Sequence, residues 1–252
     1  MLQLDHQAGA APALIFVHGW LGSRRALAPI AAHFPAQEQM RVALLGHDGS
    51  PPWTSWQHGE QAEALLETFQ GRGFLIGHSM GAQIAIEAAH RAPDRVEALV
   101  LLDPSPIIPH ARAAQAFAQL RARFETASAE ELPEVMQGFA TSMVRHGGPK
   151  ALVEEMTQGI LHAPEELIRK GFGPICDWAE GAAEKFAALQ CPILVVNAPG
   201  AANDLEDLRR ANKRMMGGLV VGSGHMVQVE AAEQAAAMIR RFAEVSRALI
   251  LR

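Results

Sequence analysis

The feature that most constrains this chain is the pentapeptide Gly-His-Ser-Met-Gly at residues 77–81, because the segments on its two sides differ so sharply. The apolar residues 73–76 precede it, and the alanine-rich residues 82–90 follow it. This order predicts a tight turn from a buried strand into a helix, with Ser79 at the apex. Glycine at both ends of the pentapeptide removes the Cβ atoms that would collide within such a turn.

The predicted turn also gives Ser79 a chemical setting. A serine at the start of a helix lies beside unpaired N–H groups and the positive end of the helix dipole, which favour negative charge on its oxygen. We therefore predict that Ser79 is a nucleophile and that residues 77–81 form a nucleophile elbow of the G-x-S-x-G kind.

Strands and helices alternate along most of the chain. Apolar runs typical of buried strands occur at residues 13–18, 41–45, 73–76, 96–102, 192–196 and 219–221. Helical segments are expected at residues 27–34, 56–69, 82–90, 205–215 and 230–248. This alternation predicts an α/β fold, a mostly parallel sheet with helices on both faces, in which ligands bind beyond the carboxyl ends of the strands.

Residues 106–184 depart from this alternation. They form successive helical segments punctuated by proline and glycine, with no predicted strand between them. We interpret them as a helical insertion, too short to be an independent domain with its own large core. The predicted α/β core therefore comprises residues 1–105 and 185–252, which suits a chain of 252 residues.

A serine hydroxyl needs a base to accept its proton and a third group to orient that base. His225 follows the last predicted strand within the sequence Gly-Ser-Gly-His-Met. A glycine-rich loop there can bring the imidazole to the edge of the sheet where Ser79 lies. We predict that His225 is the base, because most other histidines fall on predicted helices or loops that suit a structural or solvated role.

Two aspartates compete for the orienting role. Asp103 comes directly after the strand at residues 96–102, which would hold it rigidly at the edge of the sheet. Asp204 lies beyond a loop and can instead cap the helix that is expected from residue 205. We favour Asp103 and keep Asp204 as the alternative.

The oxyanion of a tetrahedral intermediate needs two N–H donors. The backbone of Met80, directly after the nucleophile, is expected to supply one of them. The backbone of Trp20 is expected to supply the other, because Gly19 lets the chain approach closely there. A purely packing role for the Trp20 ring is the competing interpretation.

Three motifs, His-Gly-Trp at residues 18–20, the elbow, and Gly-Ser-Gly-His-Met at residues 222–226, together resemble the α/β-hydrolase superfamily. The resemblance implies that fold for the core and a role for residues 106–184 as a cap over the active site. Within this cap Trp178 is a candidate for contact with the substrate, although packing of the cap onto the core is the favoured role for it and for the other candidates. Further candidates for the pocket wall are Met136, Phe139, Met143 and Phe172.

The chain departs from the pattern of this superfamily in three places. Its short N-terminus predicts a reduced leading β-hairpin. The usual acid position of the superfamily falls on Ala201, which favours Asp103 because some members carry the acid there. Asp48 replaces a glycine in the loop at residues 46–50, and we assign that loop no chemistry.

Superfamily members with the acid at the Asp103 position include ester, lactone and amide hydrolases, and also cofactor-free dioxygenases that open N-heteroaromatic rings. The dioxygenases typically have histidine after the elbow serine, where this chain has Met80. Our leading prediction is a serine hydrolase that cleaves a small, largely apolar ester, thioester or lactone through an acyl-enzyme. The dioxygenase is the first alternative, and a receptor that retains the triad to bind a ligand is the second.

Composition bears on partners and location. A net charge of -5 without a basic cluster predicts a small-molecule substrate and neither a nucleic-acid nor a membrane partner. Cys176 and Cys191 are expected to be buried thiols, since they lack metal-ligand spacing, and we predict no metal and no cofactor. Without a signal peptide or a long apolar run, a soluble cytoplasmic protein is expected, either a monomer or a homodimer.

Overall fold

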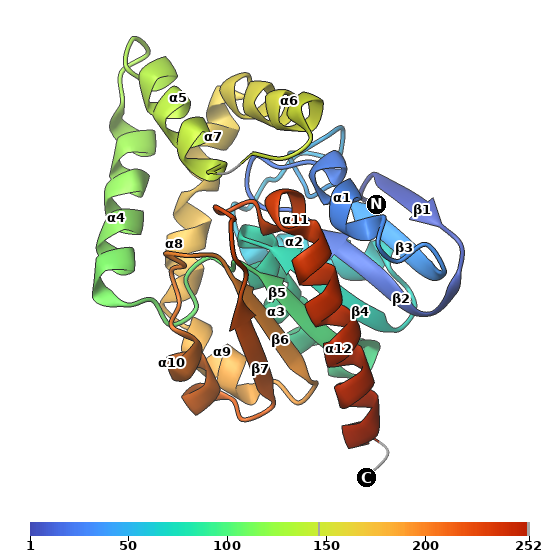
Figure 1. Cartoon of the computed structure of the whole chain (residues 1–252). Helices are drawn as coiled ribbons and strands as arrows, with labels where there is room; N and C mark the ends of the chain where they lie inside the picture. The colour runs from blue at the N-terminus through green and yellow to red at the C-terminus, as the bar shows by residue number, and fades with distance from the viewer. Residues whose placement is uncertain (146, 251–252) are drawn as a thin grey trace.

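The computed structural model describes residues 1–145 and 147–250, with side chains described through residue 246. Its centre is a seven-stranded sheet in the order β1-β3-β2-β4-β5-β6-β7 (Figure 1). Every strand pair is parallel except the pair that β1 forms with β3. The strands are β1 (Leu4–Gln7), β2 (Ala10–Val17), β3 (Gln37–Val42), β4 (Gly73–His78), β5 (Val96–Leu102), β6 (Ile193–Asn197) and β7 (Met215–Leu219).

The sheet has an apolar core on each face, because successive side chains of a strand point to opposite sides. In β2, Leu14 and Phe16 belong to one core, whereas Ile15 and Val17 belong to the other. Helices α1 (Ala28–Ala31), α11 (Val227–Glu230) and α12 (Ala232–Ile250) lie on the first face (Figure 1). Helices α2 (His58–Thr68) and α3 (Met80–Arg91) lie on the second. Short 3-10 turns occupy Arg24–Leu27 and Pro93–Arg95.

In the described part of the connection between β5 and β6 there are six helices. They are α4 (Ala111–Thr126), α5 (Leu132–Met143), α6 (Lys150–Leu161), α7 (Glu165–Gly171), α8 (Gly173–Ala179) and α9 (Ala182–Ala188). Helices α5, α6 and α7 lie beyond the end of the sheet (Figure 1). The expected boundary at residue 184 falls inside α9, where Ala182 and Phe186 are fully buried in the core on the α3 face.

The last strand and the helix before it differ from expectation. The structure places β7 at Met215–Leu219 instead of residues 219–221, and α10 (Leu205–Ala211) ends before residue 215. The Asn212 side chain ends α10 by donating hydrogen bonds to the carbonyl oxygens of Phe186 and Leu189. Gly217 interrupts the run of apolar residues, so the sequence pattern does not indicate a strand there. Glycine suits this position, because a Cβ on Gly217 would lie 2.9 Å from the Leu205 side chain.

The N-terminus contributes a single strand, β1, which lies antiparallel to β3 at one edge of the sheet.

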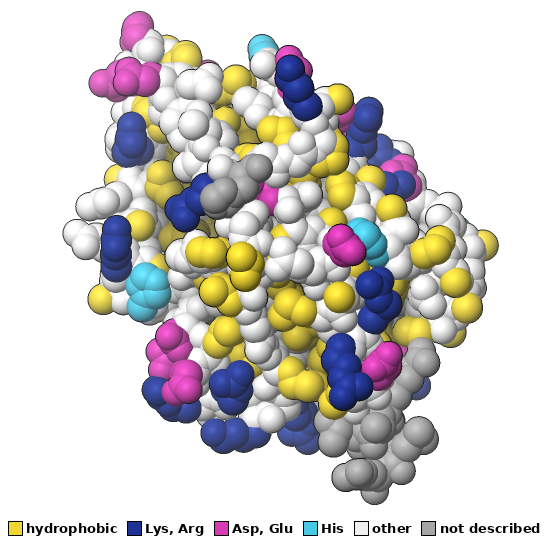
Figure 2. All heavy atoms as spheres, viewed as in Figure 1, with side chains coloured by type: hydrophobic (Ala, Val, Ile, Leu, Met, Phe, Trp, Pro, Cys, Tyr) yellow, Lys and Arg dark blue, Asp and Glu magenta, His cyan; other side chains and the backbone are white. Residues whose placement is uncertain are grey.

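Cys176 and Cys191 are only partly buried, and desolvation raises the pKa of each thiol to about 11. Among the residues described, no helix is both long and apolar enough to cross a membrane. Acidic and basic side chains are interspersed over the face drawn in Figure 2.

Candidate active site

Ser79 lies between β4 and α3 with φ 54° and ψ -120°, a backbone conformation that residues other than glycine rarely adopt. Glycine is required on both sides of it. A Cβ on Gly81 would press against the carbonyl oxygens of Val17 and His18, and one on Gly77 would lie 2.6 Å from the Ala82 backbone. The strained serine of the predicted elbow is therefore present, held by the neighbouring strand β2 and the first turn of α3.

His225 lies in the loop between β7 and α11, beside Asp103. The Nδ1 atom of His225 is 2.6 Å from Oδ2 of Asp103. A second contact holds the loop itself, since Nε2 of His78 is 2.9 Å from the backbone oxygen of His225. Burial is the main cause that lowers the pKa of His78 well below 6.5, so its ring is neutral and donates this hydrogen bond.

Both oxygens of the Asp103 carboxylate have partners. Oδ2 pairs with His225, and Oδ1 accepts a hydrogen bond of 2.9 Å from the Ala198 backbone. Asp103 has φ 40° and donates its own N–H to Val196, so the end of β5 holds the side chain rigidly. Asp204 instead caps α10, accepting hydrogen bonds from the N–H groups of Glu206 and Asp207. Only Asp103 is therefore placed to orient His225.

Ser105, for which no role was predicted, contacts Ser79, the predicted nucleophile. Among the described residues, the hydrogen-bond partner of Ser79 Oγ is Ser105 Oγ at 3.2 Å, rather than His225. Ser105 follows Asp103 on the loop after β5 and is 2% exposed. Its position could not be inferred from spacing alone, because the turn after Asp103 brings it back over the elbow.

The loop after β2, which carries Trp20, is held by two buried histidines. His18 donates to the Gly19 oxygen through Nδ1 at 2.8 Å and accepts from the Leu44 N–H through Nε2 at 3.1 Å. His47 accepts from the Leu21 N–H at 3.2 Å. Burial lowers the pKa of His18 to about 3 and that of His47 to about 4, which keeps both rings neutral and able to accept. The loop at residues 46–50 thus supports the site.

The two predicted oxyanion donors lie in different settings. Met80 is the first residue of α3, so its backbone N–H has no partner within the helix, while its side chain is fully buried. Trp20 is 8% exposed, and its indole N–H donates to the Leu167 oxygen at 3.2 Å. Three phenylalanine rings surround the indole with centroids at 5.0–5.3 Å, namely Phe124, Phe139 and Phe172. The Trp20 side chain therefore packs the insertion onto the core.

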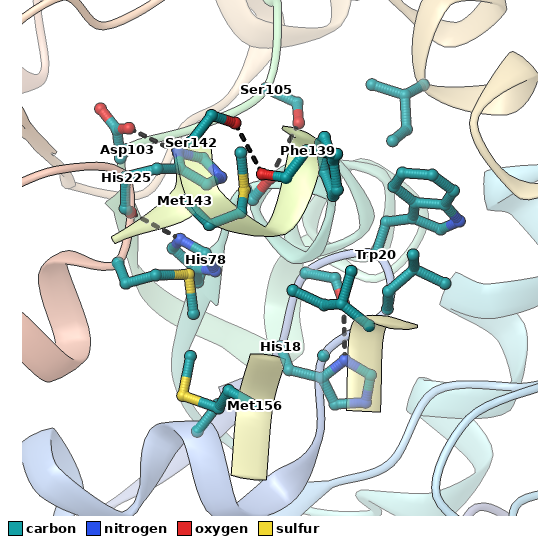
Figure 3. Close-up of a pocket in the computed structure, with 18 of the residues that line it drawn as sticks. His18, Trp20, His78, Asp103, Ser105, Phe139, Ser142, Met143, Met156 and His225 are labelled. Carbon is teal, nitrogen blue, oxygen red and sulfur yellow. Dashed lines mark hydrogen bonds and ion pairs between the residues drawn. The ribbon is translucent and has the colours of Figure 1, made fainter. Parts of the chain in front are cut away.

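A cavity of about 930 Å³ contains Ser79, Asp103, His225 and Ser105 on its wall. In Figure 3, Asp103, His225 and His78 lie on one side of this cavity and Trp20 on the other, and three residues of α5 lie across it. Those three are Phe139, Ser142 and Met143. The apolar part of the wall also includes Phe117, Leu120, Met156, Ile160, Phe172 and Ile175.

The prediction that Trp178 lines the pocket is wrong. Its indole N–H donates to the Glu87 carboxylate at 3.0 Å, and its ring stacks on His58. Glu87 is buried and also pairs with Lys185 and Arg91, and these hydrogen bonds outweigh its desolvation and lower its pKa to about 2. Trp178 therefore faces α3 as part of this ion cluster.

Of the other candidates, Phe139, Met143 and Phe172 line the cavity, and the buried Met136 does not.

Two more polar side chains hold the loops of the site. Asn203, which is 2% exposed, donates to the oxygens of Pro104 and Ser105 and accepts from the N–H groups of Ile107 and Ile108. The Glu230 carboxylate accepts one hydrogen bond from the Gly224 N–H and another from the Arg145 N–H. Glu230 thus ties the His225 loop to the insertion. No local pattern in the sequence indicates these contacts of Asn203, because its partners at residues 104–108 are far from it along the chain.

The chain matches the model of the alpha/beta hydrolase family over residues 14–238. Esterase YbfF of Escherichia coli (strain K12) is 24% identical over 243 residues, which cover 91% of this chain and 92% of that protein. Lipase LipV of Mycobacterium tuberculosis is 36% identical over 110 residues, which cover 41% of this chain and 42% of that protein.

Solved structures match nearly the whole length of this chain. An esterase from Exiguobacterium antarcticum has a TM-score of 0.81 and 13% identity, covering 96% of this chain and 95% of that one. A thermophilic esterase from Thermogutta terrifontis has a TM-score of 0.78 and 19% identity, covering 97% of this chain and 94% of that one. At these identities the likeness concerns the fold, and it confirms the predicted α/β architecture.

Proposed function

The chain belongs to the alpha/beta hydrolase family, and we propose that it is a serine hydrolase that cleaves a small, largely apolar ester, thioester or lactone. The observation that carries the proposal is the Asp103–His225 hydrogen bond of 2.6 Å, formed on the wall of the cavity that also holds the strained Ser79. The relatives named as an esterase and a lipase support cleavage of ester bonds.

In the proposed reaction, Ser79 Oγ attacks the carbonyl carbon of the substrate while its proton passes to Nε2 of His225. The π electrons of the carbonyl move onto its oxygen, which the N–H groups of Met80 and Trp20 stabilise. The Asp103 carboxylate keeps the Nδ1 proton on His225, so Nε2 is free to accept, and it stabilises the imidazolium that forms.

The tetrahedral intermediate then collapses. The C–O or C–S bond to the leaving group breaks, His225 gives its proton to the departing atom, and the acyl group stays on Ser79. Water attacks this ester with His225 again as the base, and the carboxylic acid is released as Ser79 recovers its proton. We further propose that residues 106–184 act as a cap, since helices α4 to α8 supply much of the apolar wall that would hold the acyl group.

Replacement of Ser79 tests the nucleophile. Ser79→Ala is expected to lower kcat by a factor of about 10⁴ or more and to abolish covalent labelling by a fluorophosphonate. His225→Ala is expected to show a comparable loss. Undiminished turnover by folded Ser79→Ala protein would overturn the proposal.

The substrate class is tested with p-nitrophenyl esters of graded acyl length, alongside thioesters, lactones and hydroxyquinolines. We expect turnover of short to medium esters and no oxygen consumption with the hydroxyquinolines. Oxygen uptake with ring opening, unaffected by Ser79→Ala, would favour the dioxygenase. Tight ligand binding with negligible turnover of every compound would favour a receptor.

A further inference from the structure

The hydroxyl of Ser105 contacts the reacting atom of the proposed mechanism, yet the Ser-His-Asp triad leaves it without a role. Ser105 Oγ lies 3.2 Å from Ser79 Oγ, on the wall of the same cavity. The Ser105 N–H also donates a hydrogen bond of 3.3 Å to the backbone carbonyl oxygen of Ser79. The two residues are thus joined through both their backbones and their side chains.

Ser105 is held as firmly as the triad residues. Its carbonyl oxygen and that of Pro104 accept hydrogen bonds from the Asn203 amide, at 3.2 Å and 2.9 Å. Asn203 is in turn fixed by the Asn197 amide, which donates to its backbone oxygen at 2.8 Å. These bonds fix the backbone that carries Ser105, so little entropy is lost when its hydroxyl bonds to Ser79, and that bond favours a single orientation of the Ser79 side chain.

We propose that Ser105 is a further catalytic residue, whose hydroxyl donates a hydrogen bond to Ser79 Oγ. The direction follows from the chemistry. If Ser79 donated to Ser105, its only proton would point away from His225. With Ser105 as the donor, the Ser79 proton is free to pass to His225 Nε2, and the Ser105 hydrogen bond stabilises the negative charge that grows on Oγ. No proton is transferred from Ser105.

The inference rests on the proposed function, and the experiment separates the two. Ser105→Ala removes the hydroxyl, whereas Ser105→Thr and Ser105→Val have the same shape and differ only in carrying or lacking it. Ser246→Ala is the matched control, because Ser246 is also 2% exposed but lies on α12, away from the residues that line the cavity. Each variant is assayed for kcat/KM on p-nitrophenyl butyrate, for the second-order rate of fluorophosphonate labelling, and for thermal midpoint.

We expect Ser105→Ala to lose roughly 10-fold in kcat/KM and in labelling rate, the effect of one hydrogen bond to a developing charge. Ser105→Val is expected to match it, Ser105→Thr to stay within about threefold of wild type, and Ser246→Ala within about twofold. If the Thr and Val variants do not fold, Ser105→Ala decides alone, since it only removes an oxygen atom.

Unchanged rates in Ser105→Ala would overturn the inference, and so would faster rates, which would mean that the bond restrains Ser79. A Ser105→Thr variant that folds but is as slow as Ser105→Val would also contradict it, because shape would then matter and the hydroxyl would not. If Ser79→Ala kept full turnover, the proposed function and this inference would both fail. An inactive Ser79→Ala with an unaffected Ser105→Ala would remove only the inference.

Discussion

At the residue scale, Asp103 and Asp204 differ in what their carboxylates already bind. Asp103 is 7% exposed, and its two oxygens hold His225 and the backbone of the loop after β6. Asp204 is exposed and spends its hydrogen bonds on the first turn of α10. An amide at these two positions should therefore have unequal consequences.

Asp103→Asn is expected to lower kcat by about 10³ to 10⁴, because the amide no longer keeps the proton on Nδ1 of His225. Asp204→Asn should leave both kcat and stability almost unchanged, because asparagine caps helices as well as aspartate does. Steady-state kinetics on one ester substrate would compare the pair. A large loss confined to Asp204→Asn would reverse the assignment of the acid.

At the scale of elements, the elbow depends on how closely α3 approaches β2. Gly81 lies in the first turn of α3 against the carbonyl oxygens of Val17 and His18. These are backbone atoms at the end of β2, a central strand, so they cannot move aside as the end of a side chain can. A methyl group added at Gly138, inside α5, would meet no atom of another described part of the chain within 4 Å.

The two glycines are therefore expected to respond in opposite ways to the same change. Gly81→Ala should lower the free energy of unfolding by about 3 kcal/mol, through overpacking against backbone. Gly138→Ala should raise it by about 0.5 to 1 kcal/mol, because alanine loses less entropy than glycine in a helix. Urea unfolding measures both, and equal stabilities would contradict this account of the elbow.

Some strands and helices were predictable from the sequence, whereas the positions of others depend on tertiary contacts. The elbow strand and β5 were predictable because their buried runs are continuous. β5 ends where expected, before Pro104, whereas β4 continues two residues beyond the predicted run, through Gly77 and His78. β7 was misplaced because Gly217 weakens its pattern, while its fit against Leu205 is a tertiary contact. The end of α10 likewise depends on carbonyl groups supplied by α9, which no local pattern contains.

At the scale of the whole molecule, four buried histidines, namely His18, His47, His58 and His78, link stability to pH. Burial is the main cause that lowers the pKa of His18 to about 3 and those of His47 and His58 to about 4, from 6.5. Below pH 6.5 the unfolded chain binds protons that the folded chain excludes. The free energy of unfolding should therefore fall as pH drops from 6.5 towards 4, by about 1.4 kcal/mol per pH unit for each ring.

His58→Gln tests this linkage away from the candidate active site. His58 Nε2 bonds to Gln83 at 2.9 Å, and its Nδ1 has no partner among the described residues. Between pH 6.5 and 4, the free energy of unfolding of the variant should fall less steeply with decreasing pH than that of wild type, by about 1.4 kcal/mol per pH unit. Parallel curves for variant and wild type in urea unfolding across this range would contradict the prediction.

The candidate site as a whole was predictable to the extent that its residues end strands. Ser79 and Asp103 directly follow strands of a parallel sheet, and His225 lies on the loop after another strand, so all three are expected at one edge of the sheet. Ser105 and Asn203 meet only through loop geometry. Trp178 was misassigned because an aromatic residue in the insertion can face either the cavity or α3, and the buried Glu87 decides between them.

The proposed acid, Asp103, follows β5, so the tip of the loop after β6, where the superfamily usually has its acid, carries no proposed catalytic group. Residues 199–202 line the cavity, while Asn203 anchors the end of that loop. Natural or directed evolution can therefore vary this tip in sequence and length without disturbing the groups that make and break bonds. A library confined to these positions would be the shortest route to new substrate preferences on this scaffold.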